Sequence, residues 1–281
     1  GVQTCALPIF SKIDNATTNN QIDGIVSDGR QSINAITPDT SIKRNAKNDI
    51  DIKAAYKKIK IQRINDATDE EIQEANRKIE EAKIEAKDNI QRNSTRDQVN
   101  EAKTNGINKI ENITPATTVK SEARQAVQNK ANEQINHIQN TPDATNEEKD
   151  EAKRLLEISK NKTITNINQA QTNNQVDNAK DNGMNEIATI IPATTIKTDA
   201  KTAIDKKAEQ QVTIINGNND ATDEEKAEAR KLVEKAKIEA KSNITNSDTE
   251  REVNGAKTNG LEKINNIQPS TQTKTNAKQE I

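Results

Sequence analysis

The amino-acid sequence repeats itself every 77 residues, without insertion or deletion. Glycines, prolines and an Ala-Thr-Asp/Asn-Glu-Glu segment all recur at this spacing. The glycines are Gly29, Gly106, Gly183 and Gly260, the prolines are Pro38, Pro115, Pro192 and Pro269, and the segments begin at Ala67, Ala144 and Ala221. A fixed period is typical of one structural unit copied in tandem. The sequence therefore constrains the architecture closely, whereas it identifies no binding partner.

The period predicts three complete repeats and two partial ones. We place the complete repeats at residues 38–114, 115–191 and 192–268, and the partial ones at 10–37 and 269–281. The first partial repeat would hold the end of a second helix and a third helix. Both ends of the chain fall inside a repeat, so we interpret the chain as an internal piece of a longer protein.

Residues 1–9 do not follow the repeat. They should match the helical stretch 78–86, but they read GVQTCALPI and contain Pro8, which we expect to interrupt a helix. This string resembles a translated sequencing adapter, and we interpret it as an artefact rather than as the remnant of a signal peptide, since it has no basic segment. This segment contains Cys5, the only cysteine in the sequence. Without the segment the chain has no cysteine, which excludes disulfide and thiolate chemistry.

Composition argues against a broad globular core. Aromatic residues make up 1% of the chain, apolar residues 30% and charged residues 31%, which leaves narrow helical bundles or disorder. The net charge of −2 comes from evenly spread charges, so nucleic-acid binding has no electrostatic support. We find no apolar stretch of the roughly 20 residues that a membrane span needs.

Each repeat reads as helix, turn, helix, turn, helix. In the repeat 115–191, apolar residues recur at steps of three and four, as expected for amphipathic helices, and the first helix should be roughly 25 residues or about 37 Å long. Capping boxes open the second and third helices. They are Thr18/Gln21, Thr68/Glu71, Thr95/Gln98, Thr145/Glu148, Thr172/Gln175, Thr222/Glu225 and Thr249/Glu252. The predicted fold is all-α, with tandem three-helix bundles arranged as an elongated rod.

The repeated glycine lies on the apolar face of the third helix, where it costs about 1 kcal/mol relative to alanine. We attribute it to close approach of a neighbouring helix, with a bend or flexible point as the alternative. The period also serves as an internal control for sites. His137 and Tyr56 are not repeated, so we expect His137 to be solvated or at the edge of the core and Tyr56 to be exposed. Met184 matches Ile107 and Leu261 and should be core.

The runs 140–149, 177–183 and 191–195 resemble a unit found in tandem on staphylococcal surface proteins, the domain of unknown function 1542. The resemblance covers residues 13–281. It implies an extended, helical, wall-attached stalk in large proteins linked to adhesion, biofilm, cell accumulation and methicillin resistance. It supplies no catalytic or binding residues.

We therefore predict no catalytic residue, no cofactor and no metal. The acidic cluster Asp69-Glu70-Glu71 fits helix capping better than calcium binding, which needs more oxygen ligands arranged by a loop. The favoured function is a non-enzymatic stalk of a cell-wall-anchored adhesin. The alternative is a binding module that contacts host matrix, or copies on neighbouring cells, weakly and multivalently. A third possibility, a disordered linker, is opposed by the seven capping boxes.

Overall fold

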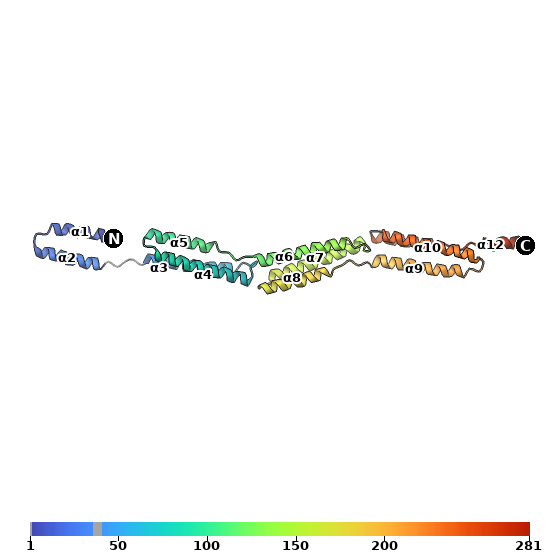
Figure 1. The fold of residues 1–281 in the computed structure, drawn as a ribbon, viewed down its shortest axis with the longest axis horizontal. Helices are drawn as coiled ribbons and strands as arrows, with labels where there is room; N and C mark the ends of the chain where they lie inside the picture. Colours follow the sequence, from blue (N-terminus) through green and yellow to red (C-terminus); the bar gives the residue numbers. More distant parts are fainter. Residues whose placement is uncertain (1, 36–40) are drawn as a thin grey trace. The chain divides into compact units, whose positions relative to one another are not determined.

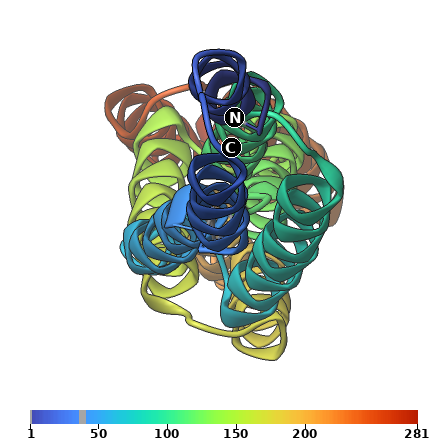
Figure 2. The ribbon, with the colours of Figure 1, turned by 90° about the vertical axis from the view of Figure 1, so that its left-hand side faces the viewer.

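The computed structural model describes residues 2–35 and 41–281, with side chains from Pro8 onward. These residues form helices and connecting turns and contain no strand (Figures 1 and 2). The fold is therefore all-α, as predicted. Pro38, the boundary at 37/38 and the side chain of Cys5 lie outside the described part, so the predictions made for them stay predictions.

Contacts within the chain define two compact units. The first comprises residues 1–64 and 73–115, and the second comprises residues 65–72 and 116–281. The helices that begin before residue 115 are α1 (Val2–Asp14), α2 (Asn19–Asn34), α3 (Ser41–Ile61), α4 (Asp69–Arg92) and α5 (Arg96–Glu111). Those after it are α6 (Thr118–Gln139), α7 (Asn146–Gln169), α8 (Asn173–Ala188), α9 (Thr195–Asn216), α10 (Asp223–Thr245), α11 (Glu250–Asn265) and α12 (Gln272–Gln279).

In the second unit, helices α6, α7 and α8 each pack against the other two, and so do α9, α10 and α11 (Figure 1). The core of the first group is the stripe predicted from helical spacing. Its fully or nearly fully buried side chains are Ala123, Val127, Ala131, Ile138, Ala152, Leu156, Ile167, Val176 and Ile187. Met184 packs against this core and is partly buried. Small alanines alternate with single large residues, so the helices approach closely around a thin core.

The first helix of this group is shorter than expected. Helix α6 begins at Thr118, three residues after Pro115, and has 22 residues, which corresponds to about 33 Å. Its partner α8 ends at Ala188, before the predicted last apolar residue, Ile190. Proline disfavours the helical conformation of the residue before it, and here the chain leaves the helix several residues ahead of Pro192.

Helix α1 contradicts the expectation that Pro8 interrupts the chain's first segment. The helix runs continuously from Val2 to Asp14 with Pro8 inside it. A proline within a helix forfeits one backbone hydrogen bond but does not forbid the helix where packing compensates. Here α1 packs against α2, and Ile9 faces Gly29, where an added Cβ would lie 3.1 Å from the isoleucine Cγ2. Whether residues 1–9 are an artefact is a separate matter and remains a prediction.

The repeated glycine marks close helix packing, as predicted. A Cβ added at Gly260 of α11 would lie 2.5 Å from the Ala240 Cβ in α10 and 2.9 Å from the Ile204 Cδ1 in α9. The equivalent Gly106 would place a Cβ 2.9 Å from the Ile50 Cδ1 and still closer to Ala86. These distances are far below ordinary carbon–carbon contact. The glycine therefore lets the third helix rest directly on the other two.

Candidate functional site at the repeat junctions

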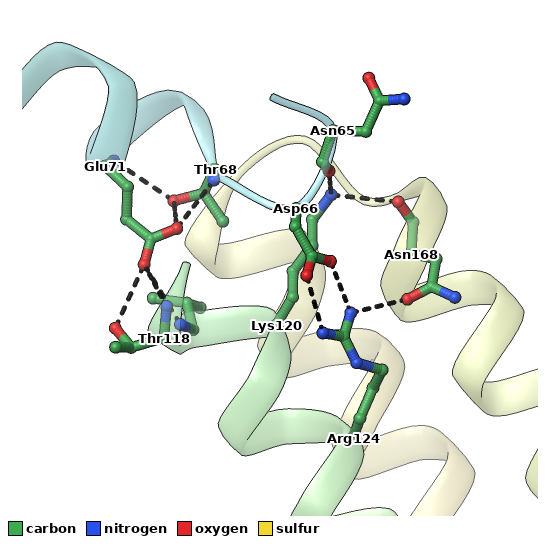
Figure 3. A network of polar contacts seen from close by, with 9 residues as sticks. Asn65, Asp66, Thr68, Glu71, Thr118, Lys120, Arg124 and Asn168 are labelled. Atoms are coloured by element: carbon green, nitrogen blue, oxygen red, sulfur yellow. Dashed lines mark hydrogen bonds and ion pairs between the residues drawn. The ribbon is translucent and has the colours of Figure 1, made fainter. Parts of the chain in front are cut away.

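The most elaborate polar arrangement in the second unit lies where one repeat meets the next. Helix α6 has no capping side chain of its own, since Thr117 makes no side-chain cap hydrogen bond. Its first backbone N–H groups are met instead by Glu71, from the preceding repeat. The Oε1 atom of Glu71 accepts hydrogen bonds from the N–H groups of Thr118 and Val119, at 2.9 and 3.2 Å (Figure 3).

The same glutamate caps its own helix. The other carboxylate oxygen of Glu71 accepts from the N–H of Thr68 at 2.9 Å, and the N–H of Glu71 donates to the Thr68 hydroxyl at 3.3 Å. This is the predicted capping box, and the hydrogen bonds of all seven predicted boxes are present. A single carboxylate thus sits at two helix N-termini, where the partial positive charge of each favours it.

The arrangement recurs at offset 77. Glu148 accepts from the N–H of Ile196 at 3.1 Å and from the Thr195 hydroxyl at 3.2 Å, and its second oxygen meets the Thr145 N–H at 2.9 Å. Glu225 does the same with Thr273. Because the shared glutamate contact recurs at each of these junctions, the Ala-Thr-Asp/Asn-Glu-Glu segment connects repeats as well as starting a helix.

Hydrogen bonding lowers the pKa of two of these carboxyl groups, Glu71 and Glu225. The backbone N–H of Thr222, followed by that of Thr273, lowers the pKa of Glu225 to about 2. Burial alone would raise the pKa of Glu71, but the N–H groups of Thr68, Val119 and Thr118 together outweigh it and lower the pKa. Both groups are therefore anionic at neutral pH, as a helix cap requires.

A buried lysine completes the first two of these junctions, and the equivalent Lys274 is exposed. The ammonium group of Lys120 donates to the carbonyl of Asn65 at 2.7 Å and to that of Asn168 at 3.0 Å (Figure 3). The first carbonyl belongs to the preceding repeat and the second lies in the last turn of α7. Lys197 bonds the carbonyls of Pro142 and Thr245 in the same way, at 3.4 and 2.9 Å. The lysine therefore satisfies a helix C-terminus and ties it to the neighbouring turn.

An ion pair lies beside each lysine. Arg124 donates two hydrogen bonds to the carboxylate of Asp66, at 2.8 and 3.0 Å, and a third to the side chain of Asn168 (Figure 3). The Arg124 hydrogen bond is the main cause that lowers the pKa of Asp66. The next junction places Lys201 3.1 Å from Asp143. The pair is half exposed, so it adds orientation more than stability.

The third helix of a repeat also touches the preceding one. Backbone N–H groups donate to carbonyls across the junction, from Asp69 to Gln171 and from Asn146 to Asp248, both at 2.8 Å. The carboxylate of Glu147 accepts from the N–H of Glu250 at 2.9 Å, which lowers the pKa of Glu147. One turn thus bonds the first helix and the start of the third helix of the following repeat directly, and Lys120 links the turn to the end of the second.

The residues weighed as sites from the sequence lie apart from one another. His137 is exposed, and its carbonyl accepts a hydrogen bond from the Thr141 hydroxyl at 3.1 Å. Tyr56 is 60% exposed, as predicted for an unrepeated surface residue. Within the described residues no group of three or more His, Cys, Asp or Glu side chains could hold a metal ion. The prediction that the chain has no catalytic or metal site is not tested by this arrangement.

Sequence reasoning identified the glutamates only as local caps and missed the lysines. Their signal was present in the internal alignment, where Lys43, Lys120, Lys197 and Lys274 are spaced by 77 residues. A lysine that recurs next to an apolar stripe can extend along the core and place its ammonium group at a helix end. No helix in the described part of the chain is long and apolar enough to cross a membrane.

Comparison with known proteins places this repeat in a family. The sequence model of a domain of unknown function, DUF1542, matches residues 42–118, 119–195 and 196–272, three consecutive segments that cover most of the chain. The chain belongs to this family. The DUF1542 matches have the length of the repeats we predicted and begin four residues later. The exact boundaries therefore remain a prediction.

Curated relatives of this DUF1542 chain come from Staphylococcus aureus. The extracellular matrix-binding protein ebh of strain MRSA252 is 28% identical over 254 residues, and EbhA of strain Mu3, which carries the same description, is 27% identical over 254 residues. Each alignment covers 90% of this chain but only 2% and 4% of the two relatives. The chain thus spans a very small part of the proteins that it matches. No solved structure matches it.

The narrower resemblance that we also infer from the repeat residues, to the methicillin-resistance surface protein FmtB, is not shown by these comparisons. The two S. aureus relatives are both described as extracellular matrix-binding proteins.

Proposed function

We propose that this chain is a non-enzymatic structural spacer of a staphylococcal cell-surface adhesin. In this role its DUF1542 repeats, each a three-helix bundle, form an elongated stalk that projects distal domains from the cell wall. The observation that carries the proposal is the shared helix cap. One glutamate per junction closes a helix in its own repeat and a helix in the next, so neighbouring repeats complete each other.

The chemistry of the junction supports stiffness rather than free swinging. Between the repeats 115–191 and 192–268, Glu148 and Glu147 accept hydrogen bonds, and Lys197 donates one to the Pro142 carbonyl. All three bonds involve a charged group, and such bonds are the stronger kind. Lys197 is 3% exposed, so separation of the repeats would take the Pro142 carbonyl away from its ammonium partner. A stalk needs resistance to bending at such points, and nearest-neighbour contacts are what tandem arrays use to supply it.

The wider assignment draws on the family and its relatives. We propose that the complete protein is anchored to the cell wall and supports adhesion or biofilm accumulation, which agrees with the description of its relatives as extracellular matrix-binding proteins. A link to methicillin resistance would follow if the resemblance to FmtB holds.

Small-angle X-ray scattering of the whole chain tests the spacer. Three complete and two partial repeats laid end to end at about 40 Å each would extend roughly 150 Å, from the helix rise. A rod of that length has a radius of gyration of about 43 Å, whereas a compact protein of this size would have about 19 Å. A value near the compact limit would refute the stalk.

The junction is tested in the same experiment with variants. Glu148→Ala removes the shared cap at one junction, and we expect a broader distribution of particle lengths and a smaller mean radius of gyration. The matched control is Glu151→Ala, because Glu151 lies one turn further along the same helix and, among the residues that the structure describes, pairs only with Arg154 at the surface. If both variants scatter like the unmodified chain, the shared cap does not stiffen the array.

A second candidate function is a binding module that contacts extracellular matrix directly or copies on neighbouring cells. The description of the relatives favours it. Immobilised matrix proteins and immobilised copies of the chain should then retain the soluble chain at micromolar concentration. Retention by neither surface would leave the spacer as the function of these repeats.

A further inference from the structure

The repeats carry a groove that the spacer role does not require. In the first unit it lies between α4 and α5 and has a volume of about 390 Å³. In the second unit the equivalent groove lies between α10 and α11 and has a volume of about 460 Å³. The two are related by two repeat lengths, and their lining residues correspond position by position. Both volumes are within the range of ligand-binding pockets.

The floor of the groove is made by small residues. In the second unit Ala236, Ala240 and Gly260 lie there, and the two helices approach closely at the glycine. Small residues alone explain helix packing and indicate no ligand. The indication comes from the residues on the walls.

Two asparagines on the walls are identical in all three complete repeats. One series is Asn89, Asn166 and Asn243, and the other is Asn105, Asn182 and Asn259. All six are exposed, and none of their side chains makes a hydrogen bond within the described residues. Asparagine is a poorer helix former than alanine by several tenths of a kcal/mol, so its place in the middle of a helix is not explained by helix stability.

Other repeated surface residues have a visible reason for their repetition. The pair Glu80 and Lys83 recurs in each complete repeat and forms an ion pair every time, at 2.6 to 2.7 Å. Repeated residues at the junctions make the contacts described above. The groove asparagines are repeated without an internal partner, which points to a partner from outside.

The charges that line the groove cancel in the first unit and leave one negative charge in the second. The ionised lining residues are Glu85, Arg92, Glu101 and Lys109 in the first unit and Glu239, Glu252 and Lys263 in the second. Glu239 on α10 pairs with Lys263 on α11 at 2.7 Å, and Glu85 pairs with Lys109 in the first unit. In the middle repeat the two signs are exchanged, since Lys162 stands on the second helix and Glu186 on the third, 3.2 Å apart. Each repeat therefore keeps one ion pair between its second and third helices at this place, although the sign of the charge at each of the two positions differs between repeats. Neither groove therefore carries the strong charge of one sign that would select a charged ligand.

We propose that the groove binds an extended, uncharged stretch of polypeptide through its backbone. A carboxamide both donates and accepts hydrogen bonds, which matches the N–H and C=O of a peptide group. The floor of alanine and glycine lets a backbone approach closely, and the absence of aromatic residues from the lining offers no stacking surface to a sugar ring. One weak site recurring along the chain would act by multivalency.

The middle repeat is a natural comparison. Thr163 stands where the other two repeats have Ala86 and Ala240, and a Cβ at Gly183 would lie 2.7 Å from the Thr163 Cβ. The larger side chain fills the floor between α7 and α8. We expect the groove of this repeat to bind weakly or not at all, and Thr163→Ala to open it.

The test is a nuclear magnetic resonance titration of the whole chain with a blocked peptide of glycine, serine and glutamine, which carries no charge. The side-chain amide signals of Asn105 and Asn259 should shift on binding. The double variant Asn105→Ala and Asn259→Ala should bind at least about tenfold more weakly, because each groove loses one carboxamide that makes more than one hydrogen bond. Alanine favours the helix, so this variant is expected to fold.

The matched control is Asn108→Ala with Asn185→Ala, which replaces two exposed asparagines of third helices outside the groove lining. It should bind the peptide like the unmodified chain, and Thr163→Ala should raise the number of bound peptides from two to three per chain. Absence of shifts at millimolar peptide, or equal binding by both double variants, overturns the proposal. Shifts with oligomers of N-acetylglucosamine but not with peptide would overturn it in favour of a glycan site. None of these results depends on the stalk being rigid.

Discussion

The substitution Gly260→Ala separates helix propensity from helix packing. Alanine is favoured over glycine in a helix interior by about 1 kcal/mol. At Gly260, however, the new methyl group would lie 2.5 Å from the Ala240 Cβ and 2.9 Å from the Ile204 Cδ1. Ordinary contact is about 3.5–4.0 Å, so α11 has to move outward by about 1 Å. Overpacking of this kind costs about 1–3 kcal/mol, and we expect a net loss of up to about 2 kcal/mol.

Gly255→Ala is the matched control in the same helix. A Cβ at Gly255 would meet nothing within 4 Å, so the variant should gain the full helix-propensity term of about 1 kcal/mol. The difference between the two variants is then the packing cost alone. Hydrogen exchange measured on peptides from α11 reports local stability, and each 1.4 kcal/mol changes the exchange rate of a protected amide about tenfold. Equal slowing of exchange in both variants would refute the packing explanation of the repeated glycine.

Three further predictions concern the junctions and the ion pair at the groove. Because the pKa of Glu225 is lowered to about 2, its contribution to stability is present at neutral pH and is lost as the pH falls from about 4.5 toward 2. Hydrogen exchange of the amides at the start of α10 should therefore accelerate in this pH range. In the variant Glu225→Gln the stability of the same segment should not depend on pH in this range. Lys197→Met leaves the Thr245 carbonyl without its ammonium partner and should lower the unfolding free energy of the repeat 192–268, measured in urea, by about 1–3 kcal/mol. Lys153→Met is the control: Lys153 is half-exposed, so its replacement should change the unfolding free energy little. Lys162→Glu should lower the melting temperature slightly because it places two glutamates together. Adding Glu186→Lys should restore the melting temperature, since the double variant recreates the arrangement of Glu239 and Lys263. A double variant that melts no higher than the single variant would contradict this ion-pair explanation.

The local features of the fold could be predicted because their determinants are close in sequence. Thr145 and Glu148 are three residues apart, and a capping box needs nothing else. The apolar stripes were predictable for the same reason, since helical spacing is a property of one segment. The packing role of the glycine followed from its position on a stripe, without knowledge of which neighbour it meets.

The contacts between repeats could not be predicted in this way. Nothing near Thr118 in sequence shows that Glu71, 47 residues earlier, will accept its N–H. The expected length of the first helix was wrong for a related reason. The helix begins at Thr118, three residues after Pro115, where Glu71 of the preceding repeat accepts the N–H groups of its first turn. Helix ends set by distant partners are not encoded by local propensity.

The shared cap also determines what counts as a folding unit in this family. The first helix of a repeat, such as α6, has no side-chain cap of its own, and its N–H groups are satisfied by Glu71 of the repeat before it. A single repeat excised at any boundary between Glu71 and Thr118 loses that carboxylate. It also loses the carbonyl of Asn65, one of the two that hold the buried ammonium group of Lys120. The unfolding free energy of two linked repeats should therefore be more than twice that of one isolated repeat. The reason is that each repeat supplies hydrogen-bond partners that the next repeat lacks on its own.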